Sequence, residues 1–422
     1  MNEATRQFAL AHADDDVRQL ALKGCKDAAV DLAMALQQIS GRQTARRKVP
    51  SWAAIDDIRY PVHLSMEQCS SEATALYKVR LVDMAIGGGI PCRKLVDLTG
   101  GLGVDFAFLC TLFEEGVYVE RDKELYAIAH HNFQVLGQMG LLKPLGLPGQ
   151  LRQIGTPTVS VVCAEAEGFL HNLEEHVTMI FVDPARRDSR GARTYGIGDC
   201  TPNVLPLMDE LLRKADYVML KLSPMLDWRK AVNDVGSERV EQVHIVATGG
   251  ECKELLLLLS AKGSKQQLLV CSNDGHQETF LLKAGAAGAN ETTQNTSLSQ
   301  QPHFLYEPHA ALMKGGFFAE IAQRYTVSQL SLNSHLFLSN TLVEGFPGRT
   351  FRIKAVSTMN KQELKEKVLP LKQANISVRN FPMTADVLRK KLKLSEGGDN
   401  YLFATTLADG RHIILVCQKH TV

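Results

Sequence analysis

The segment VDLTGGLGVD, residues 96–105, contains the residues best suited to bind a small-molecule ligand. An apolar strand is expected to end at Asp97, and glycines follow at positions 100, 101 and 103 before a helix. Glycines there let a ligand approach the backbone, because a Cβ atom would occupy that space. The next apolar run, VYVE, ends in Glu120, nineteen residues beyond Gly101. A carboxylate at this place can accept hydrogen bonds from both ribose hydroxyls of a nucleoside.

The third glycine position distinguishes two possible ligands. A dinucleotide turn has the pattern GxGxxG, but Phe106 stands at the third position and would prevent close helix–strand packing. No Gly-Lys-Ser or Gly-Lys-Thr follows the glycines, so a phosphate-binding P-loop is not expected. S-adenosylmethionine has no pyrophosphate, and Asp97 and Asp105 could face its sulfonium and ammonium groups. A glycine-rich turn that binds nothing is the alternative.

Two further acidic residues follow apolar runs in the same way. Glu165 comes after VSVVC, where a carboxylate could accept a hydrogen bond from an adenine amino group, and Asp183 comes after MIFV. Ligands of open α/β sheets bind beyond the carboxyl ends of the strands, so these acids are expected along one edge.

The elements that would position these residues alternate between short apolar runs and helices, a pattern typical of a parallel α/β sheet. We expect a seven-stranded domain over residues 91–284, preceded by a helical region over 1–90. A small segment over 303–348 and a small α/β unit over 349–422 follow, after a polar linker over 284–302. The expected strands are Lys94–Leu98, Val117–Val119, Val159–Cys163, Met179–Val182, Tyr217–Lys221, Val243–Ala247 and Gln267–Cys271.

Three local features complete the expected secondary structure. The arginine-rich stretch 42–48, just before Pro50, is interpreted as a link, and Ser70 to Met84 as a helix capped by Ser70 or Ser71. The stretch 248–254 is expected to begin a leucine-rich helix. Asp409-Gly410 is expected to turn a C-terminal hairpin.

Composition and charge limit the functional classes. The chain has 422 residues, 45% hydrophobic and 22% charged, which is typical of globular proteins. It has no run of about 18 apolar residues, no basic-then-apolar leader, and nine cysteines without a CxxC pair. We therefore expect a cytoplasmic protein with no membrane partner and no metal. The net charge is +1, but residues 351–422 have 13 Lys or Arg against 6 Asp or Glu, which favours a polyanionic partner such as RNA.

At this point the chain resembles the class I S-adenosylmethionine-dependent methyltransferases over residues 92–271. The resemblance depends on VDLTGGLGVD, VYVERD, CAEA and FVDPARR, in the order of that family. It implies a Rossmann-like sheet and S-adenosylmethionine as cofactor. The candidate cofactor-binding residues are Asp97, Thr99, Gly101, Gly103, Asp105, Glu120 and Glu165. Further along, FLYEPHAALMKGGF and NTLVEGFPGRTFRIK are similar to a bacterial group with ferredoxin-like and THUMP-like domains after the methyltransferase domain; THUMP domains in other enzymes bind RNA.

The acceptor site follows the fourth strand. Family members that methylate base amines have Asp/Asn-Pro-Pro-aromatic there; Asp183 and Pro184 match, whereas Ala185 and Arg186 replace the second proline and the aromatic. Asp183 is the candidate to orient the nucleophile or accept its proton, with the Pro184 carbonyl as a second acceptor. The candidate substrate-binding residues are Arg186, Arg187, Lys221, Lys390 and Lys391.

These residues predict a methyltransferase that acts on RNA, at a base amine or a ring nitrogen. Methylation at carbon 5 of a pyrimidine is disfavoured, because no cysteine follows the fifth strand at Lys221-Leu222-Ser223. Two alternatives stay open: a methyltransferase for a small molecule or protein, and a non-catalytic RNA-binding protein that keeps the fold.

Overall fold

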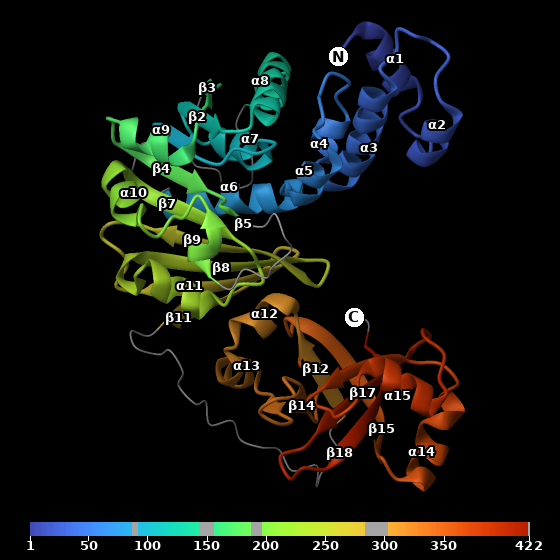
Figure 1. Ribbon diagram of the computed structural model, residues 1–422. Helices are drawn as coiled ribbons and strands as arrows, with labels where there is room; N and C mark the ends of the chain where they lie inside the picture. The colour runs from blue at the N-terminus through green and yellow to red at the C-terminus, as the bar shows by residue number, and fades with distance from the viewer. Residues whose placement is uncertain (87–91, 143–155, 187–195, 283–302, 421–422) are drawn as a thin grey trace. The chain divides into compact units, whose positions relative to one another are not determined.

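A computed structural model describes residues 1–86, 92–142, 156–186, 196–282 and 303–420 (Figure 1). The chain divides into two compact units, one formed by residues 1–242 and 255–265 and the other by 243–254 and 266–422. The predicted linker over 284–302 lies outside the described residues. Within the described ranges, no helix is both long and apolar enough to cross a membrane.

The first unit begins with the predicted helical region. Its helices are α1 (Glu3–Ala11), α2 (Val17–Lys23), α3 (Leu32–Lys48), α4 (Pro50–Ala53), α5 (His63–Gln68) and α6 (Glu72–Ile86). Side-chain oxygens of Asn2, Asp16 and Asp31 cap the first three. Ser71 accepts a hydrogen bond from the Thr74 N–H at 3.2 Å, so Ser71 is the cap of α6.

The predicted link over residues 42–48 is wrong, because this stretch forms the last turns of α3. Gly41 does not end the helix. A Cβ atom at Gly41 would lie 2.2 Å from Cβ of Tyr60, so this glycine lets Tyr60 pack against the helix. Of the arginines that suggested a link, Arg46 and Arg47 are exposed, whereas the Arg42 side chain is only 12% exposed and pairs with Asp56 at 2.6 Å.

A nine-stranded sheet follows, in the order β11-β10-β8-β9-β7-β4-β1-β2-β3. Five strands of this sheet run parallel to their neighbours within the group. They are β1 (Lys94–Asp97), β2 (Glu115–Glu120), β3 (Thr158–Cys163), β4 (Val177–Val182) and β7 (Ala215–Leu222). The intervening helices are α7 (Val104–Cys110), α8 (Lys123–Gln138), α9 (Ala166–Asn172) and α10 (Met208–Lys214), and α11 (Trp228–Val235) follows β7. Two-residue strands β5 (Ala185–Arg186) and β6 (Cys200–Thr201) pair beside them. The expected α/β fold class is confirmed.

The leucine-rich segment is a strand, not the predicted helix. Strand β8 (Val240–Thr248) turns at Gly249 and Gly250 into β9 (Glu251–Leu259), and both glycines have positive φ. A two-residue hairpin turn of type I′ needs positive φ at both positions. The segment 254–259 of β9 is buried, and a short apolar run of this kind has the same composition in a buried strand as in a buried helix. A second hairpin pairs β10 (Gln267–Asn273) with β11 (His276–Leu282). The two strands that were not expected, β9 and β11, bring the sheet from seven strands to nine.

The parallel strands place the candidate residues at one edge. All six residues of β4 are buried, as expected for a strand covered on both faces. Because the carboxyl ends of parallel strands meet at one edge, the ends of β1, β2, β4 and β7 bring together Asp97, Glu120, Asp183 and Lys221.

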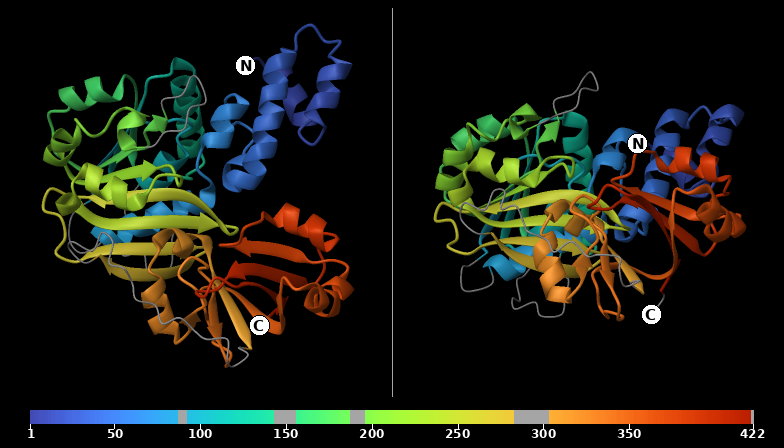
Figure 2. Two further views of the ribbon diagram at one scale, coloured as in Figure 1. Left: turned by 60° about the horizontal axis from the view of Figure 1, so that its bottom comes forward. Right: turned by 90° about the horizontal axis from the view of Figure 1, so that it is seen from below.

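The second unit contains a seven-stranded sheet in the order β13-β14-β12-β15-β18-β17-β16. The predicted hairpin is confirmed as β17 (Asn400–Thr406) and β18 (His412–Lys419). Leucines of α14 (Lys361–Lys367) and α15 (Ala385–Leu392) pack with Leu402, Ala404 and Ile414 in one apolar cluster of this sheet. Figure 2 shows the helices and strands of this part of the chain in orange and red. The elements are β12 (Phe304–Pro308), α12 (Ala310–Gly315), α13 (Phe318–Tyr325), β13 (Ser328–Gln329), β14 (Phe337–Ser339), β15 (Gly348–Thr358), α14 (Lys361–Lys367), β16 (Asn375–Arg379), α15 (Ala385–Leu392), β17 (Asn400–Thr406) and β18 (His412–Lys419).

Candidate functional site

The glycine loop between β1 and α7 is shaped by close packing. The Gly100 N–H donates to the Val119 carbonyl at 2.9 Å, and a Cβ atom at Gly100 would lie 2.0 Å from the Tyr118 ring. The Tyr118 hydroxyl donates to the Gly101 carbonyl. Gly103 has φ +83°, and a Cβ atom there would lie 2.5 Å from Phe133. Side chains at 100 and 103 would therefore displace buried aromatic rings.

Glu120 is fixed against this loop by backbone donors. One carboxylate oxygen accepts from the Gly101 N–H at 2.7 Å, and the other accepts from the Asp122 N–H at 2.8 Å. Each carboxylate oxygen can accept a second hydrogen bond, so Glu120 retains acceptor capacity for a ligand hydroxyl. The arrangement fits the role expected of this residue.

Asp97, at the end of β1, is almost completely buried at 1% exposure. Its carboxylate accepts from the Thr99 N–H at 2.9 Å. Burial raises the pKa of Asp97 well above its ordinary value, and the nearby carboxylates of Asp105, Asp183 and Glu120 raise it further, against the Thr99 hydrogen bond. A cationic ligand beside Asp97 would relieve this concentration of negative charge.

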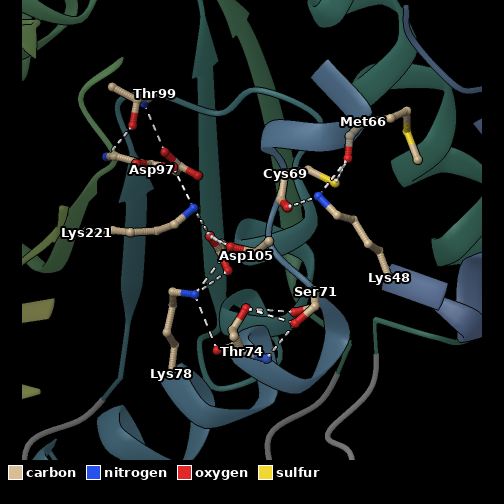
Figure 3. A network of polar contacts seen from close by, with 12 residues as sticks. Lys48, Met66, Cys69, Ser71, Thr74, Lys78, Asp97, Thr99, Asp105 and Lys221 are labelled. Atoms are coloured by element: carbon tan, nitrogen blue, oxygen red, sulfur yellow. Dashed lines mark hydrogen bonds and ion pairs between the residues drawn. The ribbon is translucent and has the colours of Figure 1, made fainter. Parts of the chain in front are cut away.

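Asp105 is held by cations of the protein itself (Figure 3). Its Oδ1 lies 3.0 Å from Nζ of Lys78, and its Oδ2 lies 3.2 Å from Nζ of Lys221 and accepts from the Ser70 hydroxyl at 2.7 Å. Burial alone would raise the pKa of Asp105, but the two lysines outweigh it and the pKa is lowered. Both carboxylate oxygens are thus engaged by protein groups, and a contact of Asp105 with cofactor stays a prediction.

Asp183 follows β4 and is linked to both neighbouring strands. Its backbone N–H donates to the Thr99 hydroxyl oxygen at 2.6 Å, and its Oδ2 lies 2.6 Å from Nζ of Lys221. The Asp183 side chain is 38% exposed, so a ligand can reach it, whereas Pro184 is buried. Lys221 was expected to contact substrate, and the structure places its ammonium between two carboxylates.

The remaining predicted residues are Glu165, Arg186, Arg187, Lys390 and Lys391. The Glu165 side chain is 65% exposed and lies 3.8 Å from Arg121. Arg186 belongs to β5, and Arg187 lies outside the described residues. Lys390 and Lys391 are exposed in the last turn of α15, in the second unit.

The contacts of Ser70 and Lys78 with Asp105 were not predicted from the sequence. Both residues come from the N-terminal helical region. A signal for Lys78 was present: Ala75, Leu81 and Val82 lie three or four residues away on the buried stripe of α6, so this lysine stands on an apolar helix face. Nothing in the sequence indicated that its partner would be Asp105.

Two family models match the C-terminal part of the chain. Residues 348–419 match the model of a THUMP domain-like family, and residues 304–347 match that of a ferredoxin-like domain. No curated protein matches the chain. Two solved structures match part of the chain. One is an rRNA methylase from Streptococcus thermophilus, with 13% identity over 44% of this chain and 97% of that chain and a TM-score of 0.30. The other is a "putative RNA methyltransferase" from Pyrococcus horikoshii, with 14% identity over 52% of this chain and 96% of that chain and a TM-score of 0.32.

One solved structure matches along nearly the whole length. It is the crystal structure of a "putative methyltransferase" from Porphyromonas gingivalis W83, with 31% identity over 99% of this chain and 98% of that chain, and a TM-score of 0.81. The chain therefore belongs to the same family, the bacterial group of class I methyltransferases with ferredoxin-like and THUMP-like domains in their C-terminal part.

Proposed function

We propose that the protein transfers a methyl group from S-adenosylmethionine to RNA, at a base amine or a ring nitrogen. The observation that carries this proposal is the group of three carboxylates, Asp97, Glu120 and Asp183, around the glycine loop. Family membership supports the methyltransferase activity.

The charges of the described residues support this cofactor. Glu120 would accept hydrogen bonds from the ribose hydroxyls, because backbone donors orient its carboxylate and leave lone pairs available. Asp97 would face the cationic part of the ligand. Gly101 would allow close approach to the backbone, because a Cβ atom there would meet nothing nearer than the Thr99 carbonyl oxygen at 3.9 Å. Gly103, packed against Phe133, and Thr99 would hold the shape of the loop. Glu165 would contact the adenine from its exposed position at the start of α9.

The cofactor supplies an electrophilic methyl group, and the protein's task is to position the nucleophile. Asp183 would accept the proton of the acceptor nitrogen or orient its lone pair, and the Pro184 carbonyl would be a second acceptor. Lys221 holds the Asp183 carboxylate in one place at 2.6 Å. Positioning of this kind can contribute about 7–11 kcal/mol to lowering a barrier.

RNA as acceptor is supported by charge and by the second unit. Residues 351–422 have 13 basic against 6 acidic residues, and Lys390 and Lys391 are exposed on α15. The match to a THUMP-like domain covers the same part of the chain. Contacts of this kind with phosphates are electrostatic and independent of sequence.

Calorimetry tests the cofactor. S-adenosylmethionine should bind the purified protein, and Asp97→Ala or Glu120→Ala should weaken binding by about 1–3 kcal/mol through lost charge-assisted hydrogen bonds. Glu175→Ala is the matched control, because Glu175 is an exposed acid that pairs with Lys94 at the amino end of β1. Binding of NADH without binding of S-adenosylmethionine would refute the cofactor assignment.

A further inference from the structure

The N-terminal helical region contributes to a buried row of alternating charges that ends at Asp183. Figure 3 shows Lys78, Asp105 and Lys221 of this row. Lys78 of α6 contacts Asp105 of α7 at 3.0 Å, Asp105 contacts Lys221 of β7 at 3.2 Å, and Lys221 contacts Asp183 at 2.6 Å. Lys78 is fully buried, and the side chains of Asp105 and Lys221 are 9% and 11% exposed. Of these four residues, Asp183 at the far end is the one that is open to a ligand.

We infer that Lys78 is a positioning residue for methyl transfer: it neutralises Asp105, and this leaves Lys221 available to hold Asp183. The inference rests on the proposed role of Asp183 in the acceptor site. It assigns a function to the N-terminal helical region, which supplies both Lys78 and the Ser70 hydroxyl that donates to Asp105.

Two carboxylates compete for the Lys221 ammonium. Two carboxylates, Asp105 and Asp183, lie within ion-pair distance of the same Nζ atom. Asp105 is the more deeply buried of the two, so its charge is the less screened by water and the more costly to leave uncompensated. With Lys78 in place, Asp105 has a second cation at 3.0 Å and a hydroxyl donor at 2.7 Å. Without Lys78, Lys221 would move toward Asp105 and away from Asp183.

Among the residues that the structure describes, the other titratable groups beside this row do not replace Lys78. Asp97 and Cys69 both interact electrostatically with Asp105, and neither can supply a positive charge. Lys48 is the nearby cation on the Cys69 side, and its Nζ donates to the carbonyls of Met66, Glu67 and Cys69.

The test compares three variants of the full-length protein. Lys78→Met removes the charge and keeps an apolar side chain of similar length. Lys78→Met/Asp105→Asn also removes the charge that Lys78 compensates. Lys214→Met is the control, because Lys214 is also a largely buried lysine, with a 12% exposed side chain, and it pairs with Glu210. Lys214 lies directly before the amino end of β7, whereas Lys221 lies near the carboxyl end of that strand.

Crystal structures give the first readout, which does not need a substrate. In Lys78→Met, Nζ of Lys221 should lie on Asp105 and outside hydrogen-bond distance of Asp183. In the double variant and in Lys214→Met it should remain on Asp183. A Lys221–Asp183 contact unchanged in Lys78→Met overturns the inference, whether or not RNA is the acceptor.

Kinetics give the second readout, with RNA from a deletion strain as acceptor. The kcat of Lys78→Met should fall roughly ten- to hundred-fold, because the acceptor carboxylate is misplaced. The Kd for S-adenosylmethionine should stay within about two-fold, and the double variant should recover part of the lost kcat, which a loss of folding would not allow. Equal loss in the single and double variants contradicts the inference. Absence of turnover in the parent protein instead refutes the RNA proposal and leaves the crystallographic test valid.

If Lys78→Met does not fold, Ser70→Ala takes its place. This change removes the 2.7 Å donor to Asp105 and should draw Lys221 in the same direction with a smaller loss of kcat. An unchanged kcat and an unchanged Lys221–Asp183 distance in Ser70→Ala would then overturn the inference.

Discussion

The Thr99 hydroxyl oxygen accepts a hydrogen bond from the backbone N–H of Asp183, with 2.6 Å between the two atoms. The Thr99 N–H in turn donates to the carboxylate of Asp97. One residue therefore connects the loop after β1, where we propose the cofactor binds, to the loop after β4, where we propose the acceptor binds.

Replacing Thr99 should disturb both loops. Thr99→Val keeps the shape of the side chain but leaves the Asp183 N–H without this acceptor, which should cost about 1–3 kcal/mol of unfolding free energy. It should also weaken S-adenosylmethionine binding. Thr99→Ser keeps the hydroxyl and is the control. Urea denaturation and calorimetry measure the two effects, and equal values for the Val and Ser variants would show that the hydroxyl contributes nothing.

Gly100 should tolerate no side chain. A Cβ atom would lie 2.0 Å from the ring of Tyr118, which is fully buried, so Gly100→Ala should destabilise the fold by about 1–3 kcal/mol. Gly168→Ala is the matched control, since Gly168 lies within α9 and a Cβ atom added there would have no neighbour within 4 Å; it should gain about 0.5–1 kcal/mol. Denaturant unfolding decides, and a stable Gly100→Ala protein would contradict the packing of Tyr118 against the glycine loop.

The pH dependence of stability should report on Asp97. Its pKa is raised in the folded protein, so the protonated form favours folding, and stability is lost as the pH rises through the folded pKa. Asp97→Asn has no such loss and can still accept from the Thr99 N–H. Its melting temperature relative to the parent should therefore increase over the pH range above about 3.9, the ordinary pKa of an aspartate. A constant difference across this range would mean that Asp97 does not titrate there.

The same shift should appear in cofactor binding. A cation beside Asp97 favours the ionised carboxylate, so S-adenosylmethionine should bind more tightly as the pH rises and should release protons on binding. Calorimetry in buffers of different ionisation enthalpy measures this release. Asp97→Asn should show less proton release than the parent, and an equal release would assign the protons to another group.

The sequence alone indicated the glycine loop, the acids after β1, β2 and β4, and the parallel strands, because these features depend on local patterns. It did not reveal the strand β9, since a buried run of leucines suits a strand or a helix equally. The ion pairs of Lys221 were also beyond it. They join residues 38 and 116 positions apart, and no local pattern specifies such a contact.

The two lysines of α15 should contribute to RNA binding. Lys390→Ala/Lys391→Ala should weaken the affinity for cellular RNA fragments and make its salt dependence shallower, by about 0.7 in slope for each phosphate that the variant no longer neutralises. Lys361→Ala/Lys365→Ala is the control, because it removes the same charge from exposed positions of α14. Fluorescence anisotropy across a salt series measures both. Equal losses of affinity in the two variants would indicate a general charge effect rather than a site on α15.

Transfer of the methyl group tests the central proposal most directly. The protein is incubated with S-adenosylmethionine labelled at the methyl group and with RNA from a strain that lacks the protein. The label should enter the RNA at a base nitrogen, identified by nucleoside mass spectrometry, and Asp183→Ala should reduce the rate far more than cofactor affinity. If no label enters the RNA while the cofactor binds, or if Asp183→Ala and Asp183→Asn both react at the parental rate, the proposed RNA methylation or the assigned role of Asp183 is wrong.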